Sequence, residues 1–283
     1  MPALIDIRRR IRSVKNTQQI TKALKMVSAA KLRRAQESMF AARPYARTMA
    51  RVLKDVAART EGEENHPLFR ATAKDGKVLI IVVTADKGLC GAFNSSLLRV
   101  AQRFLLDNAH RQIVVDAVGR KGRDYLRRRT TIRKEYIGVF QALAFSKAQE
   151  IAQSAMKAFL DREVDEVVLL FNEFKSVIQQ RIVTQRLLPL EAVEEEKKGA
   201  QEYLYEPDPR AIFDKLLPKV VETTVWQALL ESNAAEHGAR MAAMDSATRN
   251  ASQTIDSLTL YMNKVRQAAI TKEIIEVVSG SAA

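Results

Sequence analysis

The residues of this sequence best suited to chemistry follow its most apolar run. Residues 77–83 are almost all aliphatic, which is typical of a buried parallel strand, and a GxxG pattern from Gly88 to Gly91 begins five residues after Val83. A turn between a strand and a helix can hold a phosphate group at the helix N-terminus. The dinucleotide fingerprint requires G-x-G-x-x-G and a later acidic residue, and neither is present here. We therefore interpret the two glycines as a tight turn, with a phosphate site as the alternative.

Other groups that could support catalysis are few. The three histidines His66, His110 and His237 are scattered, and Cys90, the single cysteine, has no obvious activating base. No HExxH, GxSxG or CxxC motif occurs. We expect no catalytic residue, no cofactor and no metal site, and hence a chain that is not itself an enzyme. The single cysteine excludes an internal disulfide and fits a reducing compartment.

The elements that position the GxxG turn alternate between strands and helices. We expect further strands at 113–118 and 167–171, and a hairpin partner for the second of these at 177–188. A capping box at Ser146 predicts a helix that ends near residue 160. This order predicts a small Rossmann-like α/β domain with an antiparallel edge, inserted at residues 59–207.

A long helix is predicted on each side of this domain, at 1–58 and 208–283. In the C-terminal segment, apolar or small residues recur in alternating steps of three and four, which is the a/d stripe of a left-handed coiled coil. The members of this stripe are Met241, Met244, Thr248, Ala251, Ile255, Leu258, Met262, Val265 and Ala269. We expect the long C-terminal helix to start at Pro218, after a shorter helix that begins at Pro209.

The N-terminal segment carries a matching stripe that becomes polar along its length. It opens with Leu4, Ile7, Ile11 and Val14 and continues through Gln18, Thr21 and Lys25, while apolar residues move to Ile20, Leu24 and Val27. Pro44 should kink or interrupt this helix. Two interrupted stripes can bury each other, so the predicted fold class is α/β plus a long antiparallel coiled coil of the paired N- and C-terminal helices.

The net charge of +13 is concentrated at the N-terminus. Residues 1–58 hold fourteen Lys and Arg against three Asp and Glu, whereas residues 209–283 balance at eight against eight. The basic helix therefore predicts an acidic partner, which could be nucleic acid, an anionic membrane or an acidic protein. It has no interleaved aromatic residues and no basic fork, so an acidic protein is favoured. No apolar run approaches the ~20 residues that cross a bilayer, and the arginine-rich start lacks a secretory h-region.

Several motifs together resemble the gamma subunit of bacterial F-type (F1Fo) ATP synthases. The N-terminal motif combines residues 12–14 with residues 20–29, and the turn motif runs from Gly88 to Asn94. The C-terminal motifs are residues 240–244, 247–251, 263–268 and 270–274. The resemblance covers the whole chain, and Leu24 replaces the Met usual in the family, a volume-conserving change.

This resemblance implies a rotor shaft. The coiled coil would stand inside a ring of alpha and beta subunits, with the α/β domain below it. The lower end of the chain, called the foot, would bind the epsilon subunit and the membrane c-ring. Rotation of an asymmetric shaft would present a different face to each catalytic subunit and so shift its nucleotide affinity. The chain would be a peripheral protein at the cytoplasmic face of the bacterial cell membrane.

The expected partner contacts fall into two groups. The first lies on the N-terminal helix and comprises Arg8, Arg9, Leu24 and Arg33. The second lies near the C-terminus, where Arg266 and Gln267 are candidates for polar torque-bearing contacts, and Ile270, Ile274 and Val277 are part of an apolar end that must meet another surface. Two other readings remain open at this point: a basic coiled-coil protein that binds nucleic acid, and an enzyme that binds a dinucleotide.

Overall fold

The computed structural model describes residues 4–57, 66–70, 75–177, 179–190 and 209–281. The chain forms two compact units, of which one comprises 30–239 and the other combines 1–29 with 240–283. The long terminal helices α1 (Leu4–Ala57) and α5 (Pro209–Ser281) each contribute residues to both units. The predicted division into segments 1–58, 59–207 and 208–283 follows chain order and stays a prediction.

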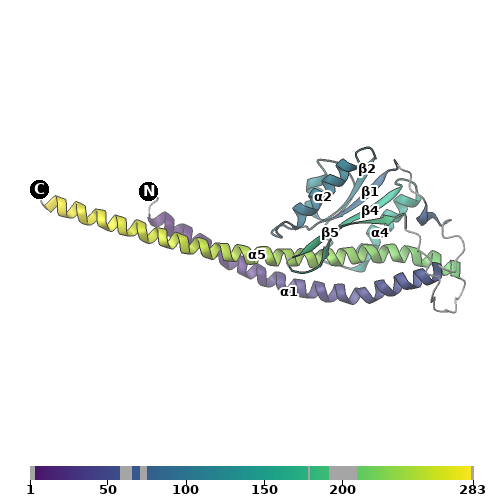
Figure 1. Ribbon diagram of the computed structural model, residues 1–283, viewed down its shortest axis with the longest axis horizontal. Coiled ribbons are helices and arrows are strands. Elements are labelled where there is room, and N and C mark those ends of the chain that lie inside the picture. The colour runs from purple at the N-terminus through teal and green to yellow at the C-terminus, as the bar shows by residue number, and fades with distance from the viewer. Residues whose placement is uncertain (1–3, 58–65, 71–74, 178, 191–208, 282–283) are drawn as a thin grey trace. The chain divides into compact units, whose positions relative to one another are not determined.

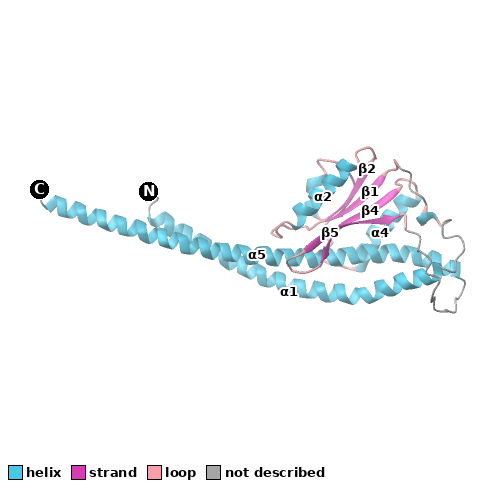
Figure 2. Cartoon of the chain, viewed as in Figure 1, coloured by secondary structure: helices cyan, strands magenta, loops and turns pink. Residues whose placement is uncertain are grey.

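The unit 30–239 is built around a five-stranded sheet, drawn in magenta in Figure 2. Its strands are β1 (Val78–Val83), β2 (Ile113–Val118), β3 (Thr131–Tyr136), β4 (Glu166–Phe174) and β5 (Gln180–Leu188). They lie in the order β3-β2-β1-β4-β5, and only β5 is antiparallel to its neighbour. All residues of β1 are buried, because it lies at the centre of the sheet with helices on both faces.

Shorter helices cover the two faces of this sheet. They are α2 (Phe93–Asp107), α3 (Arg120–Leu126) and α4 (Phe145–Leu160), and a 3-10 turn η2 spans Pro67–Phe69. Ile80 and Val82 of β1 pack with Leu97 of α2 on one face. On the other face, Leu79 and Ile81 belong to a larger cluster that includes residues of α4 and α5.

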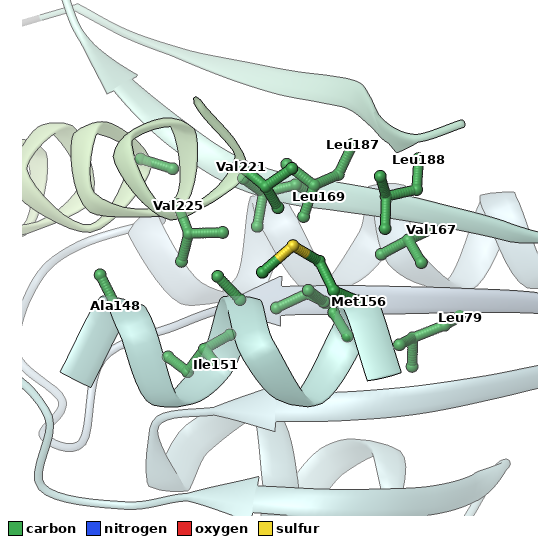
Figure 3. Packing of buried hydrophobic residues seen from close by; sticks show 14 of the residues in the cluster. Leu79, Ala148, Ile151, Met156, Val167, Leu169, Leu187, Leu188, Val221 and Val225 are labelled. Atoms are coloured by element: carbon green, nitrogen blue, oxygen red, sulfur yellow. The ribbon is translucent and has the colours of Figure 1, made fainter. Parts of the chain in front are cut away.

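The larger cluster fixes α5 against the sheet. Figure 3 shows Met156 of α4 pointing into the space between Val221 and Val225 of α5 and Leu169 of β4. Burial of each large aliphatic side chain stabilises this contact by about 1.5–3 kcal/mol. In the same unit, α1 buries Met39 and further residues at heptad spacing, and Figure 1 shows its C-terminal half running alongside α5.

In the unit formed by 1–29 and 240–283, α1 and α5 pair antiparallel. The side chains of Thr21 and Thr248 are joined by a hydrogen bond of 2.8 Å. Lys25, which follows Thr21 on α1, donates a hydrogen bond to Asp245, which precedes Thr248 on α5, as expected for antiparallel helices. The predicted stripe of α5 is half-buried or buried at every one of its nine positions, from Met241 to Ala269. The predicted fold class, paired terminal helices with an inserted α/β domain, is therefore confirmed, as is the antiparallel hairpin of β4 and β5.

Three local predictions are corrected, and one strand was not predicted. Pro44 does not interrupt α1, which continues through it. Pro218 lies inside α5 and does not start it, because the helix already begins at Pro209, where a missing N–H costs nothing. Ser146 forms no capping box, since the N-cap is Ala144 and makes no side-chain hydrogen bond. The prediction also missed the edge strand β3, whose sequence TIRKEY is mostly polar and exposed.

Candidate functional site

The interface of α1 with α5 in the unit 1–29 with 240–283 is polar at its centre. The Lys25 ammonium lies 2.5 Å from a carboxylate oxygen of Asp245, and Arg249 lies 3.1 Å from the other oxygen. Lys25 lowers the pKa of Asp245 below its ordinary value, so this carboxylate is ionised at neutral pH. Polar heptad positions lower the stability of a coiled coil but specify its register. The polar centre therefore aligns the two helices more than it stabilises them.

The polar interface leaves apolar side chains of α1 exposed. Ile20 is 60% exposed, Met26 63% and Val27 53%, whereas Thr21 and Ser28 are buried. Leu24 lies half-buried beside the interface. An isolated helical pair would gain stability from the reverse arrangement, with the apolar residues inside. This outer surface of α1 is therefore suited to contact with another macromolecule.

Positive charge covers the same part of α1. Arg8 and Arg9 are exposed, together with Arg10, Arg12, Lys15 and Lys22. The opposing part of α5 does not neutralise these charges, since the ion pairs described between the two helices in this unit join Lys25 to Asp245. Arg33, the third predicted contact arginine, lies in the unit 30–239, where it is exposed and pairs with Glu37.

The C-terminal end of α5 extends beyond the described part of α1. The antiparallel register set by Thr21 and Thr248 leaves the described part of α1, which begins at Leu4, too short to reach residues beyond 269. Every residue from 270 to 280 is exposed, including Ile270 at 48%, Ile274 at 58% and Val277 at 72%. Five of these residues are aliphatic and spread over most of the helix circumference, a distribution more usual in a buried helix than in an exposed one.

The predicted contacts thus form separate groups. Arg8, Arg9 and Leu24 lie on α1, and Arg266 and Gln267 are exposed on α5 just before the unpaired end. The structure does not bring the arginines and the apolar end of α5 into one site. The prediction missed the link between Lys25 and Asp245, although opposite charges at or beside the two heptad stripes were a usable signal.

The turn after β1 is closed by the chain's own groups. The Asp86 carboxylate accepts the backbone N–H groups of Arg120, at 3.0 Å, and Gly138, at 3.1 Å. Asn94 accepts the N–H of Ala85 at 2.9 Å. Backbone N–H groups at such a junction are the usual ligands of a bound phosphate. The Asp86 carboxylate thus occupies the N-terminus of α3, and the Asn94 side chain ties the turn after β1 to α2, so the geometry favours the tight-turn interpretation of Gly88 and Gly91.

Groups that could perform catalysis remain scattered in the described part of the chain. Cys90 is buried, and its Sγ lies 3.1 Å from Nδ2 of Asn94. Burial lowers the pKa of His66, and the nearby Asp214 only partly opposes this, so this imidazole is neutral at pH 7. No group of three or more His, Cys, Asp or Glu side chains that could hold a metal ion occurs among the described residues. A search of those residues likewise finds no helix long and apolar enough to span a membrane.

Comparison with known proteins places these features in a family. A family model described as ATP synthase matches residues 3–283. The ATP synthase gamma chain of Solibacter usitatus (strain Ellin6076) is 53% identical over 287 residues, which cover 100% of this chain and 99% of that protein. The ATP synthase gamma chain of Chlorobaculum parvum is 48% identical over 289 residues, covering 99% and 98%.

Solved structures agree. A chain from the central stalk and c-ring of the Tetrahymena thermophila mitochondrial ATP synthase matches with a TM-score of 0.63 and 28% identity, covering 81% of this chain and 99% of that one. A chain from the Euglena gracilis mitochondrial ATP synthase in rotational state 3 matches with a TM-score of 0.68 over 99% of this chain and 94% of that one. At 20% identity, the second match supports the fold alone.

Proposed function

Because this chain belongs to the ATP synthase gamma-chain family, we propose that it is the central rotor shaft of such an enzyme, coupling ion-driven rotation of a membrane ring to conformational change in catalytic subunits. The proposal depends mainly on one observation: on the paired part of α1, polar residues lie in the interface and apolar residues lie on the outside. Its interface with α5 is polar, while Ile20, Met26 and Val27 are exposed. A helical pair built in this way satisfies its outer surface only inside a larger assembly.

The proposed partners follow from the two kinds of exposed surface. The basic residues Arg8, Arg9 and Arg33, with Leu24 beside them, would face acidic surfaces of the alpha and beta subunits. The apolar end with Ile270, Ile274 and Val277 would enter an apolar sleeve within the same ring. Arg266 and Gln267 would make the polar contacts that bear torque. The epsilon subunit and the membrane c-ring would bind the foot, within the segment 59–207 and the adjoining helix ends.

The chain would act without chemistry of its own. Nucleotide binding and hydrolysis would belong to the catalytic subunits, and the shaft would change their affinities through different contacts on different faces. It would be a peripheral protein at the cytoplasmic face of the cell membrane, held there by its partners.

The direct test is to rebuild a bacterial ATP synthase from which the resident gamma chain has been removed. We expect this chain to restore ATP-driven ion pumping into vesicles, measured by quenching of a pH-sensitive dye. The purified chain alone should hydrolyse no ATP. Binding to the alpha–beta ring with no pumping at any ATP concentration would contradict the proposal, and so would ATP turnover that copurifies with the single chain.

A further inference from the structure

One buried carboxylate connects three elements of the unit 30–239. Glu231 lies on α5, and its side chain is 5% exposed. One carboxylate oxygen accepts the backbone N–H of Phe174, the last residue of β4, at 3.0 Å. The other accepts a hydrogen bond from the guanidinium of Arg43 on α1, at 3.3 Å. A single carboxylate therefore links both long helices to the end of a strand of the sheet.

The strand end that Glu231 holds is otherwise unpaired on one side. Pairing of β1 with β4 ends at Val82 and Leu170, so beyond that point β4 has only β5 as a neighbour. The backbone N–H of Asn172 points to the Ser232 hydroxyl, which accepts it at 3.3 Å. Adjacent residues of α5, Glu231 and Ser232, thus take the place of the missing strand partner.

The approach of α5 to this strand end is close. A Cβ atom on Gly238, two helical turns beyond Glu231, would lie 3.2 Å from the Phe174 ring. On the opposite side, the Arg43 guanidinium lies over the Phe40 ring, 4.8 Å from its centroid, which limits its freedom and orients it toward Glu231. Both partners of the carboxylate are therefore held in place by their own surroundings.

Directional hydrogen bonds resist sliding and rotation of packed elements more than apolar packing does. The apolar cluster between α5, α4 and the sheet resists separation, but the hydrophobic effect is non-directional and opposes sliding or rotation only through shape. Hydrogen bonds with an ionised acceptor are stronger than those between neutral groups and are sensitive to geometry. A buried carboxylate that loses one partner remains desolvated and uncompensated, so displacement at this point is costly.

We propose that Glu231, together with Arg43, is a torque clamp that fixes α1 and α5 to the α/β sheet when the rotor turns under load. This inference rests on the proposed function and adds the residues through which force crosses from the sheet to the helices. Glu231 and Arg43 are positioning residues, since they would act through the strand and the helices that they hold together. Their role is mechanical and becomes visible only against an opposing ion gradient.

The test uses the complete enzyme rebuilt with variant chains, in vesicles at matched enzyme content. Glu231→Gln removes the charge but retains an acceptor for the Phe174 N–H, and Arg43→Gln removes the charged partner on α1 while Glu231 keeps its contact with Phe174. Asp107→Asn is the matched control, because Asp107 forms an exposed ion pair with Arg103 on α2. We measure ions pumped per ATP hydrolysed and the limiting gradient, at which pumping stops.

We expect both clamp variants to hydrolyse ATP at close to the wild-type rate but to reach a limiting gradient several-fold lower. The control should match wild type, and Arg43→Lys, which keeps the charge, should restore most of the loss. A limiting gradient equal to that of the control, whether or not the melting temperature falls, would overturn the proposal. Failure of both variants to fold would also overturn it, by assigning the pair a purely structural role. Failure of the wild-type chain to pump would instead count against the proposed function.

Discussion

Two stretches of the same helix differ sharply in what surrounds them. Between Val221 and Ala239, Gln227 is the one exposed residue, because this part of α5 packs among the sheet, α4 and α1. Between Met241 and Ala269, every residue of the heptad stripe is buried or half-buried, and most residues outside it are exposed. The first stretch is part of a globular core, and the second is one half of a two-helix pair.

The difference separates stability from recognition. The packed stretch contributes large fully buried side chains such as Leu229, and its buried acids Glu222 and Glu231 accept hydrogen bonds from other parts of the same unit. The paired stretch buries little and leaves charged and apolar groups for partners. Loss of a buried apolar side chain in the packed stretch should therefore lower the stability of the fold, and changes in the paired stretch should impair assembly and coupling without unfolding the chain.

The largest expected effect is on stability in the packed stretch. Leu229 is fully buried, so Leu229→Ala should lower the free energy of unfolding by about 3–5 kcal/mol. Leu258 is half-buried in the heptad stripe of the same helix, and Leu258→Ala should cost about 1 kcal/mol or less. Urea denaturation of the purified chain, followed by circular dichroism, measures both. Equal losses would remove the distinction between the two stretches.

The next largest effect should be a loss of assembly when the charge on α1 is reversed. Replacing Arg8, Arg9 and Arg33 by Glu should weaken association with the alpha–beta ring several-fold, because acidic partner surfaces would then repel the helix. All three side chains are exposed, so the melting temperature should change little. Assembly is measured by size-exclusion chromatography of mixed subunits. Normal assembly with a lowered melting temperature would assign these arginines to the fold.

A smaller effect is expected at the end of α5, where two kinds of contact can be compared. Removal of 277–283 takes away exposed apolar residues and should reduce the stability of the assembled enzyme while most coupling remains. Arg266→Glu with Gln267→Ala should cost more coupling per residue, because directional polar contacts transmit force. ATP synthesis driven by a proton gradient in vesicles is the measurement. Abolished synthesis in the truncated chain, with a silent double substitution, would reverse these roles.

The smallest expected effect is a pH dependence of the packed stretch. Burial opposes ionisation of Glu222, but hydrogen bonds from Lys219, Gln149 and Gln153 outweigh it and lower its pKa. A lowered pKa in the folded state means that the carboxylate stabilises the fold above its ordinary pKa, about 4.3, and that this stabilisation is lost as the pH falls through the folded value. Glu222→Gln should therefore flatten the fall in melting temperature below about pH 4.3. Glu150→Gln, in an exposed ion pair, is the control. Parallel curves for wild type and Glu222→Gln would contradict this assignment.

The sequence predicted those parts of the fold in which the spacing of apolar residues matches the pattern of buried positions. The aliphatic run of β1 and the nine-residue stripe of α5 are such cases, since burial there follows a period that the residues display. The strand β3 was missed because it lies at the sheet edge, where polar residues obscure the alternation. Pro209 and Pro218 are both compatible with a helix start, and only tertiary packing shows that the helix runs through the second.

The candidate site was less predictable. Exposure of Arg8 and Arg9 follows from their charge, but exposure of Ile20 and Val27 does not follow from their types. It depends on Thr21 and Lys25 occupying the interface, which a single helix cannot reveal. The role of Glu231 was equally hidden from the sequence. A glutamate in a helix is expected at the surface, and its burial follows only from the positions of Phe174 and Arg43 in the fold.

The central claim, that this chain is a rotating shaft, is tested most directly by observing rotation. Leu106 on α2 is 68% exposed and Cys90 is buried, so Leu106→Cys provides a single accessible thiol for a fluorescent or bead label. The rebuilt alpha–beta complex is fixed to a surface through its catalytic subunits, and the label is followed by microscopy. We expect rotation in one direction that requires ATP and stops when ATP is withdrawn. Continued ATP hydrolysis by the same complexes with a stationary label would contradict the account.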